Sequence, residues 1–296
     1  MAKKKKDSRL ALVVGIHPDS FKLSDRRLMK PVCHQQVENG QLTGSMLVQE
    51  IDSVTLGRSR KATYFLPNNI ALLLSTSEKA IESAKGIYQG YLTSQNVEVD
   101  LEKLDGDRKT GMNEISSRVC DYLEHIQTAI VFGYTTLEAF VNLSIPDDYE
   151  YTTTNSRGIT EIYDKKAIER WLTLKTKINN ILVNIYGTPK ADSQGWWGHF
   201  SNLENYRNDI IHQKTINSTE FYKVYFKSSI FEICRSPENV IQFFYDCDAK
   251  QDRTNPIWPW LKGAKGLPIN RSYNAQHFEV VGNMYEGIRK KLDERT

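Results

Sequence analysis

A long apolar stripe in the middle of the chain constrains the fold more than any other feature. Between Asn113 and Pro146, apolar side chains recur at helical spacing, at Ile115, Val119, Leu123, Ile126, Ile130, Leu137, Phe140 and Val141. This spacing predicts one long amphipathic α-helix that buries a single face. Pro146 is expected to end it, because proline lacks the amide hydrogen that a continuing helix needs.

Weaker periodic patterns predict four more helices, over residues 68–90, 165–186, 196–217 and 276–292, and the segment Val240–Phe244 suits a further short helix. Gly187 and Pro189 directly follow the second of these and are typical helix stop signals. Runs of β-branched and aromatic residues predict strands over Leu10–Ile16, Ala62–Leu66 and Phe221–Cys234. The polar stretch over residues 149–160 predicts an exposed loop or a short hairpin.

These patterns predict a chain that is mainly α with minor β. A mixed α/β N-terminal region is expected over residues 1–110, followed by a helical domain over residues 111–296 with a β-containing insertion after residue 220. A length of 296 residues fits one large domain or two small ones. With 40% hydrophobic and 25% charged residues, the composition is that of an ordinary globular protein that folds without disulfides.

The four cysteines favour a reducing compartment and no metal cofactor. Cys33, Cys120, Cys234 and Cys247 are far apart and form no CxxC pair. The dipeptide Cys33-His34 would bind a metal only if distant residues completed the site. No apolar run approaches the roughly 20 residues of a membrane span, and the N-terminus lacks the apolar core of a signal peptide. A cytoplasmic protein without a membrane partner is therefore expected.

The formal charge of +3 comes from the N-terminus. Residues 1–10 contain four lysines and Arg9 against Asp7, a sum of +4, so the remaining 286 residues sum to −1. The lysine tail is interpreted either as a solubilising terminus or as a sequence-independent contact to phosphate. Net charge therefore does not identify a partner.

Several large enzyme classes are disfavoured because their motifs are missing. The sequence contains no GxxxxGK[ST] phosphate loop, no GxGxxG, no GxSxG and no HExxH. Nucleotide hydrolases, dinucleotide-dependent dehydrogenases and the commoner hydrolases are accordingly poor candidates.

The segment Tyr206-Arg207-Asn208-Asp209-Ile210-Ile211-His212 carries the residue types that metal-independent RNA cleavage needs. An imidazole can move protons near neutral pH, and a guanidinium can stabilise negative charge on a phosphate. Spacing alone is weak support, since Arg27 and His34, Arg118 and His125, and Arg271 and His277 are similarly spaced. Asn208 distinguishes the segment, because it lies four residues before His212 on the same helical face.

One helix does not close such a site by itself. Arg207 and His212 are five residues apart, which places them about 140° apart around a helix. Either the arginine side chain wraps around the helix or a second copy of the helix contributes. The geometry favours a homodimer.

The segment resembles the motif of HEPN-domain ribonucleases, an arginine followed by a polar residue and, after three further positions, a histidine. Arg207, Asn208 and His212 match it, and Leu137–Asn142 (LEAFVN) looks like the acidic, aromatic-bearing segment of that family's first helix. The resemblance covers roughly residues 112–217. It implies an antiparallel, all-helical bundle that dimerises through its motif helices.

The resemblance also implies an activity and partners. Family members are metal-independent endoribonucleases, often toxins or effectors of antiphage abortive infection, with an antitoxin or sensor protein as a possible partner. Attack by the ribose 2′-OH would leave a 2′,3′-cyclic phosphate. By transfer, His212 would move protons, Arg207 would bind the scissile phosphate of the RNA substrate, and Asn208 would position one of them. Glu138 would be a supporting or RNA-binding residue.

Simpler interpretations stay open for each residue. Arg207 would be a solvated side chain or an ion-pair partner of Glu204, and His212 a packing residue. The chain would then be a non-catalytic HEPN-like module that binds RNA or dimerises, or an unrelated helical interaction protein. Four tryptophans would either stack on RNA bases or pack in the core, namely Trp196, Trp197, Trp258 and Trp260.

Overall fold

The computed structural model describes residues 9–93, 108–212, 220–250, 257–261, 266–270, 278–285 and 288–291. The fold is mixed α/β, with 54% helix and 23% strand among the described residues. A strand content of that size is ordinary for a globular protein, so β-structure is more than the minor component that the sequence predicted.

The chain forms two compact units. The sheet unit comprises residues 1–71 and 249–296, and the helical unit comprises residues 72–248. The predicted boundary at residue 110 therefore differs from this division, which falls at residue 72. The reason is that helices on both sides of residue 100 pack together, while the C-terminal strands complete the N-terminal sheet.

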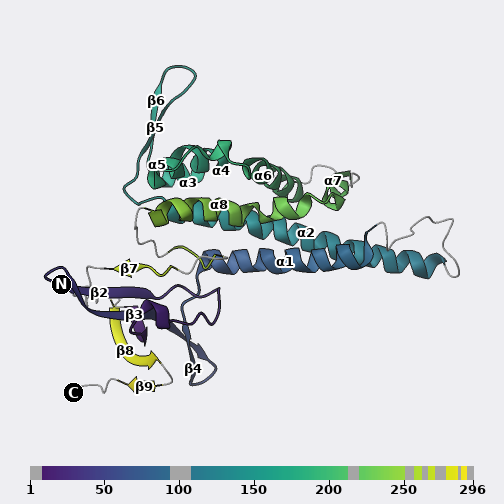
Figure 1. Ribbon diagram of the computed structural model, residues 1–296. Coiled ribbons are helices and arrows are strands. Elements are labelled where there is room, and N and C mark those ends of the chain that lie inside the picture. Colours follow the sequence, from purple (N-terminus) through teal and green to yellow (C-terminus); the bar gives the residue numbers. More distant parts are fainter. Residues whose placement is uncertain are drawn as a thin grey trace. The chain divides into compact units, whose positions relative to one another are not determined.

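The sheet unit is built on seven strands (Figure 1). They are β1 (Arg9–Gly15), β2 (Val32–Glu38), β3 (Gln41–Leu56), β4 (Arg60–Phe65), β7 (Ile269–Asn270), β8 (Phe278–Tyr285) and β9 (Ile288–Lys291), with a 3₁₀ turn η1 (Pro18–Ser20) after β1. The order is β7-β2-β3-β1-β8-β9, and β4 pairs with the end of β3. Its core contains Ala11, Val13, Cys33, Leu47, Val48, Trp258, Trp260 and Leu261.

Two pairings in this sheet are parallel, β1 with β8 and β2 with β7, while the others are antiparallel. The predicted C-terminal helix over residues 276–292 was wrong, since β8 and β9 occupy its described part. The apolar spacing of Val281, Met284 and Tyr285 suits a helix equally well, but β8 is paired on both edges by β1 and β9. The local spacing of apolar residues does not reveal strand pairing between segments that are far apart in the sequence.

Three long helices frame the helical unit, α1 (Asn69–Tyr91), α2 (Arg108–Ser144) and α8 (Ile230–Lys250). α1 runs antiparallel to α2, because Ser77 donates to the Ala129 carbonyl and Tyr88 packs on Tyr122. α8 runs parallel to α2, since Tyr122 donates to the carbonyl of Tyr225 just before α8, and Phe140 packs on Phe244 towards its end. The bundle is therefore not antiparallel throughout.

Both α1 and α8 approach α2 closely at Gly133. A Cβ atom there would lie 3.1 Å from Pro237 Cγ of α8 and 3.2 Å from Ser77 Oγ of α1. Both distances are tighter than ordinary van der Waals contact. Glycine at this position lets the three helices meet.

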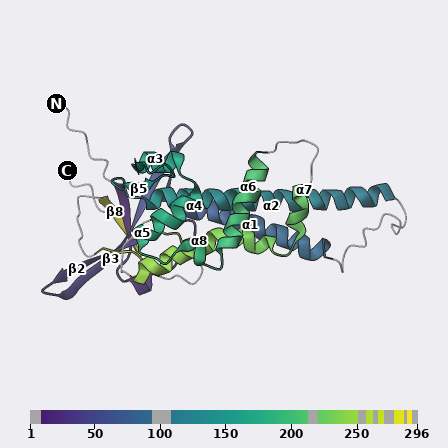
Figure 2. The same ribbon diagram turned by 90° about the horizontal axis from the view of Figure 1, so that it is seen from above.

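Shorter elements complete the helical unit. In Figure 1, α3 to α6 lie on one side of α2 and α8, and α1 lies on the opposite side. They are the hairpin β5 (Tyr151–Thr154) and β6 (Thr160–Tyr163), α3 (Lys165–Trp171), α4 (Leu174–Thr176), the π-helical η3 (Lys177–Leu182), α5 (Val183–Tyr186), η4 (Ala191–Ser193), α6 (Trp197–Ile211), α7 (Glu220–Lys223) and η5 (Val224–Phe226). Seen from above, α6 crosses α2 (Figure 2). No described helix is long and apolar enough to span a membrane.

Several local predictions are confirmed and others were wrong. The hairpin over residues 149–160 forms as β5 and β6, and Gly187 ends α5 in the left-handed conformation at φ 62°. The helix predicted over 165–186 is interrupted at Leu172, which is extended. The strands predicted over Phe221–Cys234 are instead helical.

Candidate functional site

Helix α6 is anchored at its first turn by aromatic packing. The ring of Trp196 lies 5.6 Å from that of Phe243, and the ring of Trp197 lies 5.2 Å from that of Phe200. Phe200 is fully buried. Trp196 and Trp197 therefore pack against the core, as do the buried Trp258 and Trp260 of the sheet unit.

The predicted site residues lie at the other end of α6. Arg207 is half-buried, whereas Asn208 and His212 are exposed. The helix ends at Ile211, and His212 closes it with φ −113° and ψ 44° while its N–H donates to the Asn208 carbonyl at 2.9 Å. The motif thus occupies a helix terminus and not the middle of a helix reaching residue 217. Residues 213–217 of that prediction lie outside the described chain.

Arg207 is held by two neighbours. Its guanidinium carbon lies 5.0 Å from the ring centre of Tyr134 on α2, within the range of a cation–π contact. Its Nη1 donates to Asn208 Oδ1 at 3.2 Å. The arginine and the amide are therefore joined, with the charged group stacked over a ring.

Tyr134 links Arg207 to a partly buried polar network. Its hydroxyl donates to Glu204 Oε1 at 3.2 Å, and Glu204 Oε2 forms a 2.8 Å ion pair with Lys175 Nζ. Burial, followed by the charges of Glu204 and Glu138, raises the pKa of Tyr134 well above its usual value. The phenol accordingly stays protonated and remains a hydrogen-bond donor.

Glu138 lies one turn along α2 from Tyr134. Its charge acts on Tyr134 and also on Lys177 of η3, where it opposes the lowering of the lysine pKa by burial. Lys177 donates to Asn142 Oδ1 at 3.1 Å and to the Glu169 carbonyl at 2.9 Å. Tyr134, Glu138 and Asn142 thus form a polar stripe at intervals of four residues on α2.

The structure places Arg207 over the ring of Tyr134 and joins Asn208 to Arg207, while Glu138, four residues along α2, acts on Tyr134 through its charge. Among the described residues, no hydrogen bond or ion pair joins the His212 side chain to any of them. Glu204, considered as an ion-pair partner of Arg207, pairs with Lys175 instead.

Sequence reasoning missed Tyr134 and Lys175. The interval of four residues between Tyr134 and Glu138 was a visible signal for the tyrosine. Lys175 had no such signal, because it reaches Glu204 only through the folding of α4 against α6.

The arginines of two similarly spaced pairs are engaged elsewhere. The Arg118 guanidinium lies 4.1 Å from the ring centre of Tyr91, and Arg27 forms a 2.5 Å ion pair with Asp25. Arg271 and His277 lie outside the described residues. Within the described ranges, no group of three or more His, Cys, Asp or Glu side chains is placed to hold a metal ion.

Comparison with known proteins identifies no relative. No protein-family model matches the chain, and no curated protein or solved structure is significantly similar to it. The assignment of a function therefore depends on the side chains described above.

Proposed function

We propose that the protein is a metal-independent endoribonuclease with its site at the C-terminal end of α6. The observation that carries this proposal is the placement of Arg207, stacked on Tyr134 and bonded to Asn208 at an exposed helix end that also bears His212. In the reaction, the ribose 2′-OH attacks the adjacent phosphorus and the bond to the 5′ oxygen breaks. The products are a 2′,3′-cyclic phosphate and a free 5′-OH.

Each side chain has a chemical role in this reaction. The His212 imidazole removes the 2′-OH proton or protonates the leaving oxygen, since histidine is the side chain that changes charge near neutral pH. The Arg207 guanidinium neutralises charge that develops on the phosphate oxygens. Asn208 orients Arg207, and Glu138 is a positioning residue that acts through Tyr134 and Lys177.

The proposal includes the family resemblance and its biological setting. We assign the helical unit to an HEPN-like bundle, and the protein to the toxins or effectors of antiphage defence. An antitoxin or sensor protein would then be its regulatory partner.

A homodimer completes the site in this proposal. Among the described residues, the His212 side chain forms no hydrogen bond or ion pair with the other predicted residues, and Ile211 beside it is 51% exposed. A two-fold axis near this helix end would place His212 of one copy beside Arg207 of the other. Light scattering at assay concentration is expected to give a dimer, and an active monomer would contradict this arrangement.

The test of the activity is RNA cleavage in EDTA. Purified protein is incubated with total RNA and with tRNA, and the ends of the products are identified. Arg207→Ala and His212→Ala are each expected to lower the cleavage rate by roughly 100-fold or more, as losses of charge-stabilising and acid-base groups do.

Two matched variants control for general damage. His199→Ala removes another histidine of α6, and Arg170→Ala removes another arginine stacked on a ring, that of Trp171 at 4.7 Å. Both are expected to cleave like the wild type, with circular dichroism confirming unchanged helicity. Activity that EDTA abolishes and Mg²⁺ restores would refute the proposal, as would equal losses in the control variants.

The second candidate is a non-catalytic RNA-binding module. It is favoured by the separation of His212 from Arg207 within one chain. In that case no variant changes a cleavage rate above background, and Arg207→Ala weakens RNA binding while His212→Ala does not.

A further inference from the structure

Two of the hairpins in the sheet unit, β2–β3 and β3–β4, differ in their charge. The hairpin of β2 and β3 lies within residues 31–57, a stretch with no lysine or arginine. The hairpin of β3 and β4 then carries Arg58, Arg60 and Lys61 within four residues. Residues 52–64 contain these three cations and only Asp52 as an acid, a net charge of +2.

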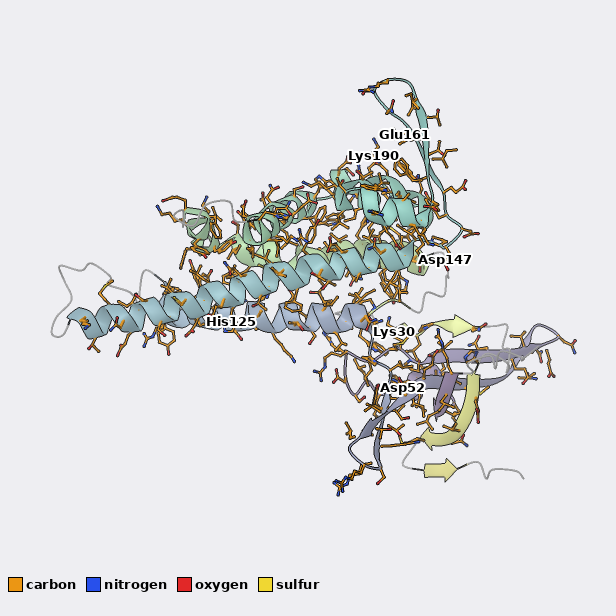
Figure 3. The ribbon with its side chains drawn as sticks, turned by 180° about the vertical axis from the view of Figure 1, so that it is seen from behind. Lys30, Asp52, His125, Asp147, Glu161 and Lys190 are labelled. Atoms are coloured by element: carbon orange, nitrogen blue, oxygen red, sulfur yellow. The ribbon has the colours of Figure 1, made fainter. Side chains whose placement is uncertain are left out.

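The hairpin of β3 and β4 extends away from the rest of the described sheet. Residues 51–56 of β3 pair with β4 alone, with Leu56 opposite Arg60 at the turn and Ile51 opposite Phe65 at the base. Gly57 turns the chain in the left-handed conformation at φ 68°. We call residues 51–65 the basic arm. Figure 3 shows nitrogen-bearing side chains gathered at its end, beyond the labelled Asp52.

One face of the basic arm combines a cation with an aromatic and apolar surface. Because side chains alternate along a strand, Arg60, Ala62 and Tyr64 share a face with Leu56, Val54 and Asp52 of the opposite strand. Val54, Leu56 and Tyr64 are 44%, 56% and 42% exposed. Apolar side chains so exposed on both strands of an arm indicate a surface that another molecule covers.

The cations of the basic arm are available for a ligand. Arg58, Arg60 and Lys61 are all exposed, and no ion pair with another described residue holds any of them. Lys61 lies on the opposite face from Arg60 and Arg58 lies in the turn, so positive charge surrounds the tip.

We propose that the basic arm is a binding site for single-stranded nucleic acid. Its cations contact backbone phosphates, and the Tyr64 ring stacks on a base beside Val54 and Leu56. Single strands are favoured over duplexes because only an unstacked base offers its face to a tyrosine. They are favoured over acidic protein segments because phosphates and bases together match the cations and the ring. The proposal is independent of the site on α6.

Binding of a fluorescent oligonucleotide tests the basic arm. The probe is a 20-nucleotide single strand with 2′-O-methyl riboses, which has no free 2′-OH and so is not cleaved by the reaction proposed above. Replacing Arg58, Arg60 and Lys61 with Gln is expected to weaken binding by up to about 100-fold at 0.1 M salt. It should also reduce the slope of log affinity against log salt by up to about 2, at about 0.7 per phosphate contact.

Two controls separate charge from stacking. Replacing the exposed Lys166, Lys190 and Lys227 with Gln removes the same charge elsewhere and is expected to leave affinity within about twofold. Tyr64→Leu is expected to weaken binding by roughly 5- to 150-fold with an unchanged salt slope. Tyr64→Phe, which keeps the ring, is expected to bind like the wild type.

Three further probes decide the outcome. A single-stranded DNA of the same sequence distinguishes the two sources of a phosphate-and-base ligand, and binding of either supports the proposal. A duplex that binds more tightly and is insensitive to Tyr64→Leu would overturn it. Displacement of the oligonucleotide by polyglutamate at equal charge would overturn it in favour of an acidic protein partner, and unchanged affinity of the triple variant would overturn it outright.

Discussion

The cations at the α6 site are held by neighbouring side chains, whereas those of the basic arm are exposed. Arg207 lies over a tyrosine ring, Lys175 pairs with a carboxylate, and Lys177 is buried with two oxygen partners. Arg58 and Arg60, by contrast, are exposed beside a turn. The first group has been ordered during folding, and the second retains its rotamer freedom.

The fixed cations suit catalysis, and the exposed cations suit binding of a flexible ligand. A group that stabilises developing charge must already be in place, because reorganisation during the reaction would raise the barrier. A group that attracts a phosphate backbone needs only charge and reach, because the ligand can adapt. We therefore expect changes near α6 to affect the chemical step and changes in the basic arm to affect binding.

The largest expected effect is a split between kcat and KM. His212→Ala is expected to lower kcat by roughly 10²- to 10⁴-fold with KM nearly unchanged, because an acid-base group acts in the transition state. The triple Gln variant of Arg58, Arg60 and Lys61 is expected to raise KM with kcat unchanged. Steady-state kinetics on one RNA measures both parameters. A lower kcat in the triple variant would contradict the assignment of the chemical step to α6 and of binding to the basic arm.

A second effect concerns Lys30, an ordered cation of the sheet unit. It is 7% exposed, donates to the Gly266 carbonyl at 3.3 Å, and has a pKa lowered to about 8 by burial. The unfolded chain, with the ordinary pKa of 10.5, binds more protons above pH 8. The free energy of unfolding of the sheet unit should therefore rise between about pH 8 and 10, by at most roughly 3 kcal/mol.

Lys30→Met removes this titration and is the matched control. Hydrogen exchange, corrected for the intrinsic rate at each pH, measures the sheet and helical units separately. The helical unit is expected to show the opposite trend above pH 10, because burial raises the pKa of Tyr122 and Tyr225, and the unfolded chain ionises first. Equal pH dependence in the wild type and Lys30→Met would show that Lys30 is hydrated.

A third prediction concerns the helix packing at Gly133, next to the tyrosine that holds Arg207. Gly133→Leu is expected to destabilise the helical unit by about 1 to 3 kcal/mol, because Pro237 and Ser77 leave no room for a side chain. It should also lower cleavage, since Tyr134 follows directly. Urea unfolding measures the stability. The control is Gly86→Leu on α1, where no atom lies within 4 Å of the added Cβ and stability should rise slightly.

A smaller effect is expected at Tyr134 itself. Tyr134→Leu removes the ring under Arg207 and is expected to lower kcat by about 10-fold, within the range of a cation–π contact. Tyr134→Phe keeps the ring, loses only the bond to Glu204, and should recover most of the rate. A purely structural tyrosine would instead change stability in both variants without restoring kcat in the phenylalanine variant.

The smallest effect is expected from the N-terminal lysines, which lie outside the described residues. Deleting residues 2–6 should leave the fold and kcat unchanged. If all four lysines contact single-stranded RNA, the salt slope falls by at most about 2.8, at about 0.7 for each. An unchanged slope would assign the tail to solubility, and loss of cleavage would mean that the active centre lies elsewhere than α6.

The parts of the fold that could be predicted are those determined by local periodicity. α1 and α2 were predicted within a few residues because each buries one apolar face. Of the helices over residues 220–250, only the part at Val240–Phe244 was predicted. Phe221, Tyr225 and Phe231 have strand-like composition, and packing against α1, α2 and α6 overrides that preference.

The candidate site divides in the same way. Arg207, Asn208 and His212 could be selected from the sequence because their spacing and chemistry are local. The network of Tyr134, Glu204 and Lys175 could not, since it joins three segments that only the fold brings together. The end of α6 at His212 was also missed, because the apolar Ile210 and Ile211 continue the periodic pattern up to that point.

The parallel pairing of β1 with β8 has a consequence for how the protein is made. Arg9 pairs with Phe278, so β1 leaves the ribosome before the helical unit and waits for a strand that follows that unit. The helical unit, whose contacts lie within residues 72–248, is complete earlier. During synthesis, the helical unit, with one half of the proposed composite site, is therefore complete before the sheet has closed, and the nascent chain carries an open edge on β1.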